Sequence, residues 1–199
     1  MKRFFVLMAF LLTGIASAHS QVKLQFAEAQ TGQTVMSQGT GYSLFNRAGD
    51  NIALCESIHL GWGKESSRST GTYVEMNAIS MPEYDETAAT FTMGLERRRY
   101  IEINSSLRYR SGCSIGGIYA VNEYTTANEK KHDSRFGLSM IYSIGIEAIF
   151  GEHLYVGGSL SLSANAMLIS SFKPTDSLPA KGNDCLWGSK LMITAGYRL

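Results

Sequence analysis

Apolar and small or polar residues alternate along much of the chain, most clearly between Arg135 and Ser171. In the segments 136–148 and 154–168, large apolar residues occupy most alternate positions, and Gly, Ser or Asn fill most positions between them. A period of two is the signature of β-strands, because successive side chains point to opposite faces. The short segment 150–153 joins the two, so this stretch predicts a β-hairpin.

The polar face of this hairpin is unusual for a sheet in water. Between Phe136 and Ser171 the only Asp, Glu, Lys or Arg residues are Glu147 and Glu152. A soluble antiparallel sheet hides its apolar face and usually solvates the other with Lys, Glu and Thr. Small neutral residues instead suit an enclosed interior, with the large apolar residues turned outward into lipid. The pattern is therefore typical of transmembrane β-barrel strands.

The same alternation recurs along the chain. It predicts further strands at 40–47, 52–63, 72–81, 88–96, 100–122 and 185–199. With the hairpin this gives an all-β, antiparallel up-and-down transmembrane β-barrel of eight strands. Ten strands result if the N-terminal lead also pairs and the long fifth strand has a turn at 111–112. Without that turn, the fifth strand projects beyond the bilayer.

One residue contradicts the alternation. Glu56 falls on the apolar face of the segment 52–63. A carboxylate facing lipid costs most near the membrane midplane and little near an interface. We expect Glu56 either to lie close to the rim of the barrel or to follow a β-bulge that shifts the register.

Residues 1–18 have the composition of a secretory signal peptide. Lys2 and Arg3 precede an apolar run from Phe4 to Leu12, and the small residues 16–18 end the segment. We predict cleavage near Ala18, a poorly patterned N-terminal lead at 19–39 with a short strand as its alternative, and a barrel domain at 40–199. Removing Lys2 and Arg3 leaves 16 basic and 17 acidic residues, a net charge of −1, with no basic patch for nucleic acid.

The bulk composition agrees with such a barrel. Charged residues make up 18% of the chain, against about 25% in soluble domains. No segment after the signal peptide is apolar and long enough for a transmembrane helix, and lipid offers no partner for unpaired backbone groups. A membrane location therefore requires a closed barrel.

An even number of strands places both chain ends on one side, taken here as the periplasmic side. The segments 64–70, 97–99 and 150–153 are then inner turns, and 48–51, 82–87, 123–134 and 172–184 face outside. Aromatic residues near the strand ends are the expected girdle at the two interfaces: Trp62, Phe150 and Tyr197 on the inner side, Phe136 and Trp187 on the outer side.

The chain resembles the small eight-stranded outer-membrane β-barrel proteins of Gram-negative bacteria. The likeness rests on the signal peptide, the two-faced strands and the ending LMITAGYRL, with Tyr197 third from the end and Leu199 in place of the usual aromatic. The resemblance implies residence in the outer membrane, contact with its lipid and lipopolysaccharide, and recognition of the C-terminal strand by the barrel-assembly machinery. It implies fold and compartment more firmly than activity.

The predicted barrel interior carries a set of charges. They are Glu75, Glu96, Glu102, Arg108, Arg110, Glu147, Lys190 and Arg198. A pair such as Glu102 and Glu147 is a conceivable acid–base couple. We favour an ion-pair network that plugs a narrow interior, because eight strands leave room only for side chains and buried charges need partners.

Other candidate chemistry is sparse. The four histidines, His19, His59, His132 and His153, have no metal-ligand spacing. Ser57 and His59 face inward two residues apart. They are a weak match to the Ser–His pair of a hydrolase, because no acidic partner is evident. Three cysteines, Cys55, Cys113 and Cys185, all expected near the outer rim, permit one disulfide of unknown pairing. We therefore predict no catalytic, cofactor or metal site.

Three functions remain open. The first is a non-enzymatic outer-membrane barrel with a plugged polar lumen, whose surface loops serve envelope structure or contact a host or other surface ligand. The second is a barrel enzyme that modifies lipid A. The third is a soluble periplasmic ligand-binding barrel, which predicts an apolar interior.

Overall fold

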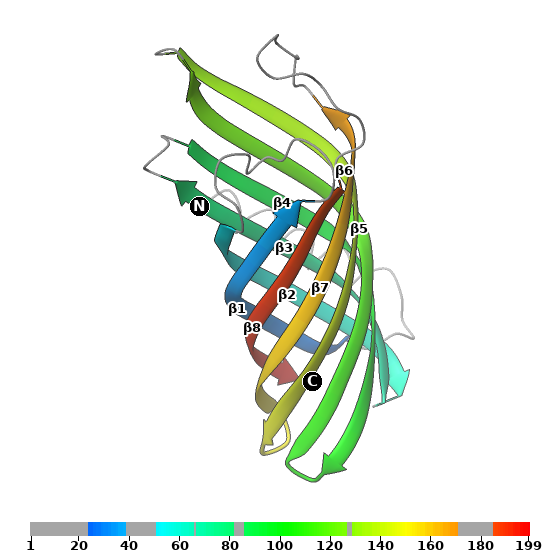
Figure 1. The fold of residues 1–199 in the computed structure, drawn as a ribbon. Coiled ribbons are helices and arrows are strands. Elements are labelled where there is room, and N and C mark those ends of the chain that lie inside the picture. The colour runs from blue at the N-terminus through cyan, green and yellow to red at the C-terminus, as the bar shows by residue number, and fades with distance from the viewer. Residues whose placement is uncertain (1–23, 39–50, 66, 82–85, 127–128, 171–184) are drawn as a thin grey trace.

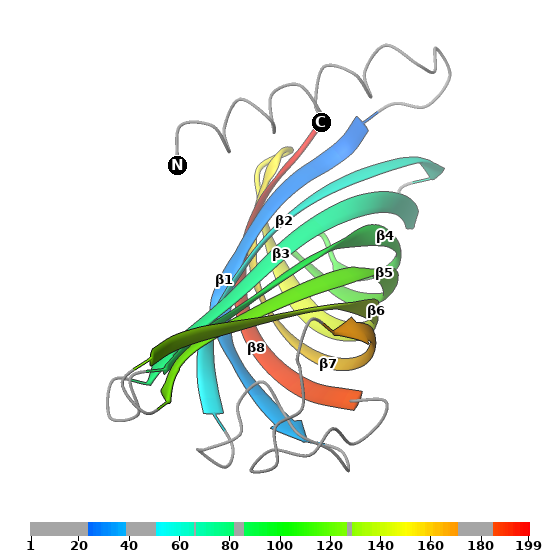
Figure 2. The ribbon, with the colours of Figure 1, turned by 90° about the horizontal axis from the view of Figure 1, so that it is seen from above.

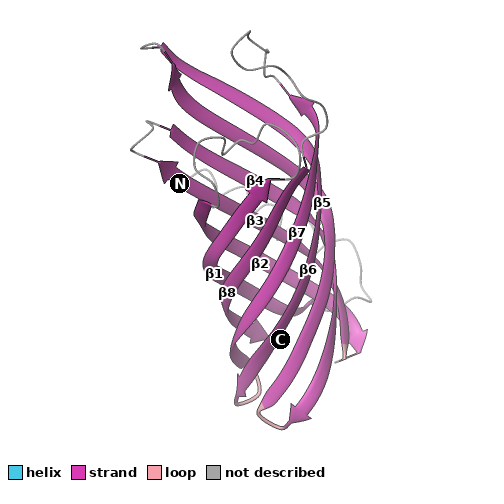
Figure 3. Cartoon of the chain, viewed as in Figure 1, coloured by secondary structure: helices cyan, strands magenta, loops and turns pink. Residues whose placement is uncertain are grey.

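The computed structural model describes residues 24–38, 51–65, 67–81, 86–126, 129–170 and 185–199. Nearly all of them lie in strands (Figure 3). The strands are β1 (Leu24–Gln38), β2 (Asn51–Glu65), β3 (Arg68–Met81), β4 (Glu86–Asn104), β5 (Leu107–Thr126), β6 (Glu129–Phe150), β7 (Leu154–Ser170) and β8 (Cys185–Arg198). Within these ranges, the structure contains no helix with the length and apolar character needed to span a membrane.

Each strand pairs antiparallel with the next, and β1 pairs with β8, which closes the barrel (Figures 1 and 2). The pairing is staggered. Partners followed once around the wall from Arg68 return to β3 at Ala78, ten residues further along. A stagger of this size requires strands that tilt steeply against the barrel axis. The prediction of an eight-stranded up-and-down barrel is confirmed.

Large apolar side chains cover the outside of the wall. Leu160, Leu162 and Ile193 are each more than half exposed, and Tyr197 is 44% exposed. The residues between them on β7 and β8, including Ser161 and Thr194, are buried in the interior. The sheet therefore has the predicted orientation, with its apolar face outward.

The N-terminal strand differs from the prediction. Residues 19–39 were expected to form a lead, whereas β1 spans Leu24–Gln38 and pairs with both β2 and β8. Its outward positions hold the small or polar residues Ala29, Thr31 and Gln33, so the large apolar residues that mark the outer face of the other strands are missing at these positions. The first strand predicted at 40–47 and the signal peptide at 1–18 lie outside the described residues.

Two of the predicted inner turns are wrong in extent. The segment 97–99 lies within β4, which continues to Asn104, and the turn is formed by residues 105–106. The segment 64–70 is mostly strand, because β2 ends at Glu65 and β3 begins at Arg68. The turn after β6 is as predicted and uses Gly151 at a φ of 67°, a conformation that glycine adopts without strain.

The β5–β6 hairpin is longer than the sequence pattern predicted. The segment 123–134 was expected to be a loop, but β5 continues to Thr126 and β6 begins at Glu129. Its tip extends well beyond the ends of β1 and β8 (Figure 1). Ser111 pairs in register with Arg99 and Ile144, so the additional turn at 111–112 is absent and the long strand projects instead.

Candidate functional site

The interior is organised around the carboxylate of Glu28, which is fully enclosed. Arg98 Nη1 donates to its Oε2 at 2.9 Å, and Arg110 Nη1 donates to its Oε1 at 3.0 Å. The hydroxyl of Tyr155 donates to Oε2 at 2.8 Å. Gln30 Nε2 also donates to Oε1. Because an isolated buried charge is costly, these four donors together stabilise the buried carboxylate.

The ion pairs continue on both sides of Glu28. Arg110 and Arg108 both contact Glu147, with Arg110 Nε 3.2 Å from Oε1 and Arg108 Nε 2.6 Å from Oε2. Arg98 Nε lies 3.1 Å from Glu96 Oε1. The guanidinium of Arg108 also lies over the rings of Tyr100 and Tyr155, at 4.3 and 4.7 Å from their centroids. The interior at this level is filled by charged and aromatic side chains.

Aromatic rings from β1 and β7 cover glycines on the neighbouring strands. Phe26 lies opposite Gly61 and Tyr155 lies opposite Gly196 in the register. A Cβ built on either glycine would overlap the facing ring. These glycines therefore make the space in which the two rings lie flat against the wall.

A second group of polar side chains lies further along the interior. Lys190 forms an ion pair with Glu75, and Asn77 Nδ2 donates to Glu75 Oε1 and to Thr90 Oγ1, both at 3.0 Å. All four side chains are buried. Together with the first group, each of the four carboxylates has a cationic partner, a balanced arrangement that fits a low-dielectric interior.

The interior also contains a Ser–His–Glu arrangement. Ser57 Oγ lies 2.9 Å from His59 Nε2, and His59 Nδ1 lies 2.9 Å from Glu96 Oε2. The acidic partner that the sequence did not reveal is therefore Glu96, on β4. The His59 ring stacks on Tyr73 at 5.8 Å. All three members are more than nine-tenths buried within the barrel.

The structure brings six of the eight predicted lumen charges into these two groups. They are Glu75, Glu96, Arg108, Arg110, Glu147 and Lys190. Glu102 is exposed near the inner end of β4, and Arg198 is half-buried at the end of β8. Neither takes part in an ion pair given for the described side chains. The suggested Glu102–Glu147 couple is wrong, because Glu147 is held by two arginines instead.

Sequence reasoning missed Glu28, the carboxylate with the most partners, and Arg98, which joins it to Glu96. Glu28 lay in the segment read as a lead, and Arg98 in the segment read as a turn. The signal that could have found Arg98 is its parity, because Glu96, Arg98 and Tyr100 continue the inward positions of the strand without a break.

The five girdle residues all lie on the outer surface. Phe136, Phe150, Trp187 and Tyr197 are exposed, and Trp62 is partly exposed. Trp62, Phe150 and Tyr197 lie near strand ends at the inner side, and His153 stacks on Tyr197 at 5.2 Å. Phe136 pairs in register with Tyr119, which adds a further exposed aromatic on the outer side.

Comparison with solved structures places this architecture among known folds. Neisserial surface protein A superposes with a TM-score of 0.63 at 7% sequence identity, over 90% of this chain and 100% of that one. The chain has the fold of the small outer-membrane β-barrels. Ail, the attachment invasion locus protein of Yersinia pestis, gives 0.52 at 9% identity, over 89% of this chain and 100% of that one.

A major outer membrane protein from Thermus thermophilus gives a TM-score of 0.52 at 10% identity, over 87% of this chain and 99% of that chain. No family model and no curated protein matches the sequence. At these identities the likeness shows the fold, and any activity has to be argued from this outer-membrane-type barrel's own residues.

Two of the cysteines expected near the outer rim lie on different faces of the wall. Cys55 faces the interior, whereas Cys113 is exposed on the outer surface opposite Arg97 and Tyr142. Both thiols are free, and they lie on opposite faces of the wall, which excludes a bond between them. The side chain of Cys185 lies outside the described residues. Within the described ranges, no cluster of three His, Cys, Asp or Glu side chains could hold a metal ion.

The described surface of the β5–β6 hairpin is polar and charged. Lys130 Nζ lies 3.9 Å from Glu123 Oε1, and both side chains are more than half exposed. His132 is exposed as well. A surface pair at this distance contributes little stability, so these charges are available to contact other molecules.

Proposed function

We propose that this chain is an integral outer-membrane β-barrel, non-enzymatic, that works through its outer surface. The observation that carries the proposal is the inverted distribution of side chains, with a mostly apolar exterior and an interior that contains networks of ion pairs. An exposed apolar surface of this extent is incompatible with a monomer in water. It matches the lipid-facing band of a transmembrane barrel.

The soluble ligand-binding alternative predicts an apolar interior. The interior instead holds Glu28, Glu75, Glu96, Glu147 and their cationic partners. A described interior with this many charges does not match the predicted apolar one, and we do not retain this alternative.

For the working surface we propose the projecting β5–β6 hairpin. Its strands are paired as far as Thr126 and Glu129, so the hairpin carries charged side chains away from the barrel. A charged projection suits contact with a host surface or with the sugars and phosphates of lipopolysaccharide. We further propose that β8, with Tyr197 on its outer face, is the strand that the barrel-assembly machinery recognises.

The compartment is tested by fractionation. We expect the protein in the outer-membrane fraction, resistant to carbonate extraction, and migrating faster in detergent gels before boiling than after. Protease added to intact cells should cut the chain within 123–134, and a tag inserted there should be accessible from outside. Extraction by carbonate, or a tag accessible only after the outer membrane is opened, would contradict the proposal.

A second candidate function is favoured by one observation, the Ser57–His59–Glu96 arrangement. Its hydrogen bonds have the order of a Ser–His–acid triad, which is why a lipid A-modifying hydrolase stays under test. Against it, the three side chains are enclosed by the wall, so an acyl chain would have to enter the barrel to reach Ser57. Glu96 is also engaged by Arg98.

Two measurements separate these functions. Mass spectra of lipid A should be identical in cells with the wild-type gene, without it, and with Ser57→Ala. A fluorophosphonate probe should fail to label Ser57 in the folded barrel. A loss of acyl chains that depends on Ser57 would replace the first proposal with the second.

A further inference from the structure

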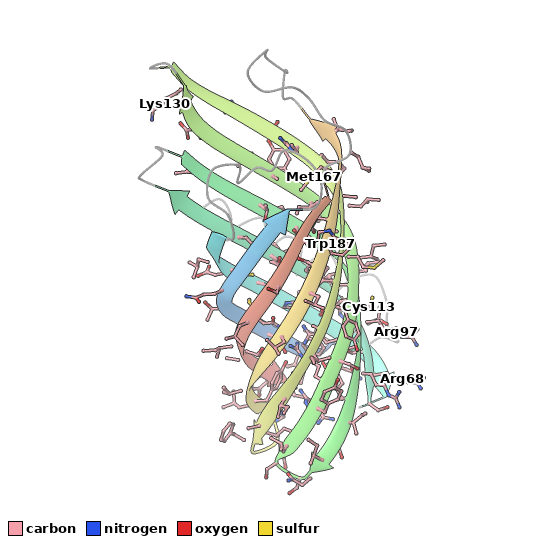
Figure 4. The ribbon with its side chains drawn as sticks, viewed as in Figure 1. Arg68, Arg97, Cys113, Lys130, Met167 and Trp187 are labelled. Carbon is pink, nitrogen blue, oxygen red and sulfur yellow. The ribbon has the colours of Figure 1, made fainter. Side chains whose placement is uncertain are left out.

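Three arginines form a cluster on the outer face of the wall. Arg68 on β3 lies directly opposite Arg99 on β4, and Arg97 lies two positions further along β4, opposite Thr70. All three side chains are exposed. Arg68 and Arg97 extend away from the same side of the barrel (Figure 4). We call Arg68, Arg97 and Arg99 the basic cluster.

The charge of the basic cluster is not neutralised by the described side chains. None of the ion pairs given for them includes Arg68, Arg97 or Arg99. The register places one acidic residue, Glu65, opposite Arg68, which leaves the formal charge positive. Like charges directly opposite one another destabilise a sheet, so a bound anion would relieve the repulsion between these arginines.

The position of the cluster shows which part of the membrane it meets. Arg68 is the first residue of β3, at the end of the barrel that carries the short turns 105–106 and 151–153. Trp62 of the inner girdle, Thr70 and Arg97 lie side by side in one row of the sheet. Short turns mark the periplasmic end, so the cluster lies in the periplasmic half of the wall.

Apolar side chains flank the cluster on the same face. Leu95 and Ile101 of β4 are exposed on either side of Arg97 and Arg99. A site with arginines between apolar side chains matches a lipid, whose phosphate lies at the interface while its acyl chains cover the wall. The long arginine side chains can also bend toward the interface.

We propose that the basic cluster binds the phosphate of an anionic phospholipid in the periplasmic leaflet. Guanidinium groups suit this role because they donate two parallel hydrogen bonds to phosphate oxygens and are readily desolvated. The inference rests on the proposed membrane function, which fixes the end of the barrel that meets the periplasmic leaflet. Lipopolysaccharide occupies the opposite leaflet, near the β5–β6 hairpin.

The test uses the full-length barrel in detergent micelles, with phosphatidylglycerol or neutral phosphatidylcholine added and bound lipid counted by native mass spectrometry. We expect a preference for phosphatidylglycerol. Arg97→Gln with Arg99→Gln should weaken it by about fivefold per arginine. The control Lys130→Gln with Lys131→Gln removes two positive charges at the far end of the barrel and should leave the preference unchanged.

The possible results distinguish failure of the lipid site from failure of the proposed function. Equal binding of both lipids by the wild type, or an equal loss in both double variants, overturns the lipid site. So does binding of purified lipopolysaccharide, and not phosphatidylglycerol, through Arg97 and Arg99. Heat-modifiable migration of every variant is measured in parallel. A barrel that inserts and folds but shows no preference removes this inference alone, whereas failure to insert removes the proposed function.

Discussion

At the scale of single residues, the interior depends on a few charges with several partners each. Glu28 on β1 accepts from Arg98 on β4 and Arg110 on β5. It also accepts from Tyr155 on β7. These strands lie around the whole circumference, so one carboxylate ties the wall together across the lumen. Removing its charge takes one of two carboxylate partners from each of the buried Arg98 and Arg110, because Arg98 also contacts Glu96 and Arg110 also contacts Glu147.

We predict that Glu28→Gln lowers the free energy of unfolding by about 3–5 kcal/mol, the usual cost of removing one partner from a buried ion pair. Urea unfolding of the barrel in lipid vesicles measures it. The matched control is Glu56→Gln. Glu56 is exposed on the outer face, so neutralising it should leave stability unchanged or raise it. Equal effects of the two changes would contradict the central role of Glu28.

The register around Glu56 decides between the two explanations for its outward position, a place near the rim or a β-bulge. Its register with Thr31 and Met76 is continuous. The β-bulge offered as an explanation is therefore wrong at this position, and the carboxylate does face outward. That Glu56 lies near the rim of the barrel, where a carboxylate facing outward costs little, remains a prediction.

Two glycines allow a test of the packing of the interior aromatic rings. In Gly196→Val the new side chain would overlap the ring of Tyr155, which would have to leave its position against the wall and its bond to Glu28. We predict a loss of about 1–3 kcal/mol, as for overpacking elsewhere. Gly158→Val is the control, because a Cβ there meets only Met192 O at 3.9 Å. Unfolding midpoints that shift equally would exclude this packing role.

At the scale of elements, the arginine run 97–99 shows how a strand distributes three consecutive like charges. Arg98 points inward to Glu28 and Glu96, whereas Arg97 and Arg99 point outward. The alternation of side chains separates the three charges onto two faces. A run of three arginines, which the sequence suggested was a turn, can therefore lie within a continuous strand. The inward arginine needs carboxylate partners, and the outward ones need a polar environment.

The prediction at this scale concerns the β5–β6 hairpin. Replacing 122–133 with a two-residue turn should leave the barrel folded, because the removed pairs lie beyond the aromatic residues of the outer girdle. Tyr119 and Phe136 stay in place. We expect unchanged heat-modifiable migration and loss of surface binding. A variant that no longer folds would show that the hairpin is part of the barrel's stability.

At the scale of the whole molecule, the filled interior determines which ions and solutes can pass through the barrel. Two groups of ion pairs and the rings of Tyr100 and Tyr155 occupy the lumen of an eight-stranded barrel, which is narrow to begin with. We predict no discrete single-channel steps in planar bilayers and no swelling of vesicles in sugar solutions, with a large water-filled porin as the positive control. Stable conductance steps would show that the interior opens.

The alternation of side chains let the sequence determine the architecture. Strands such as the 136–148 and 154–168 segments show their two faces directly, and eight of them can satisfy their backbone groups in lipid only by closing. The outward positions of Leu162 and Ile193 followed from this pattern alone. Six of the interior charges followed in the same way, because parity places them inside wherever the strand is recognised.

Only the tertiary structure decided which charges meet. Glu28 lies 70 residues from Arg98 and 127 from Tyr155 in the chain, and the stagger of the closed sheet sets those contacts. The same is true of His59 on β2 and Glu96 on β4, which meet inside the barrel, and of Arg68 and Arg99, which lie on the neighbouring strands β3 and β4. The alternation along a strand determines which face each side chain occupies, because a period of two can be read from a few consecutive residues. Its partner depends on the register of all eight strands, which a single sequence does not display.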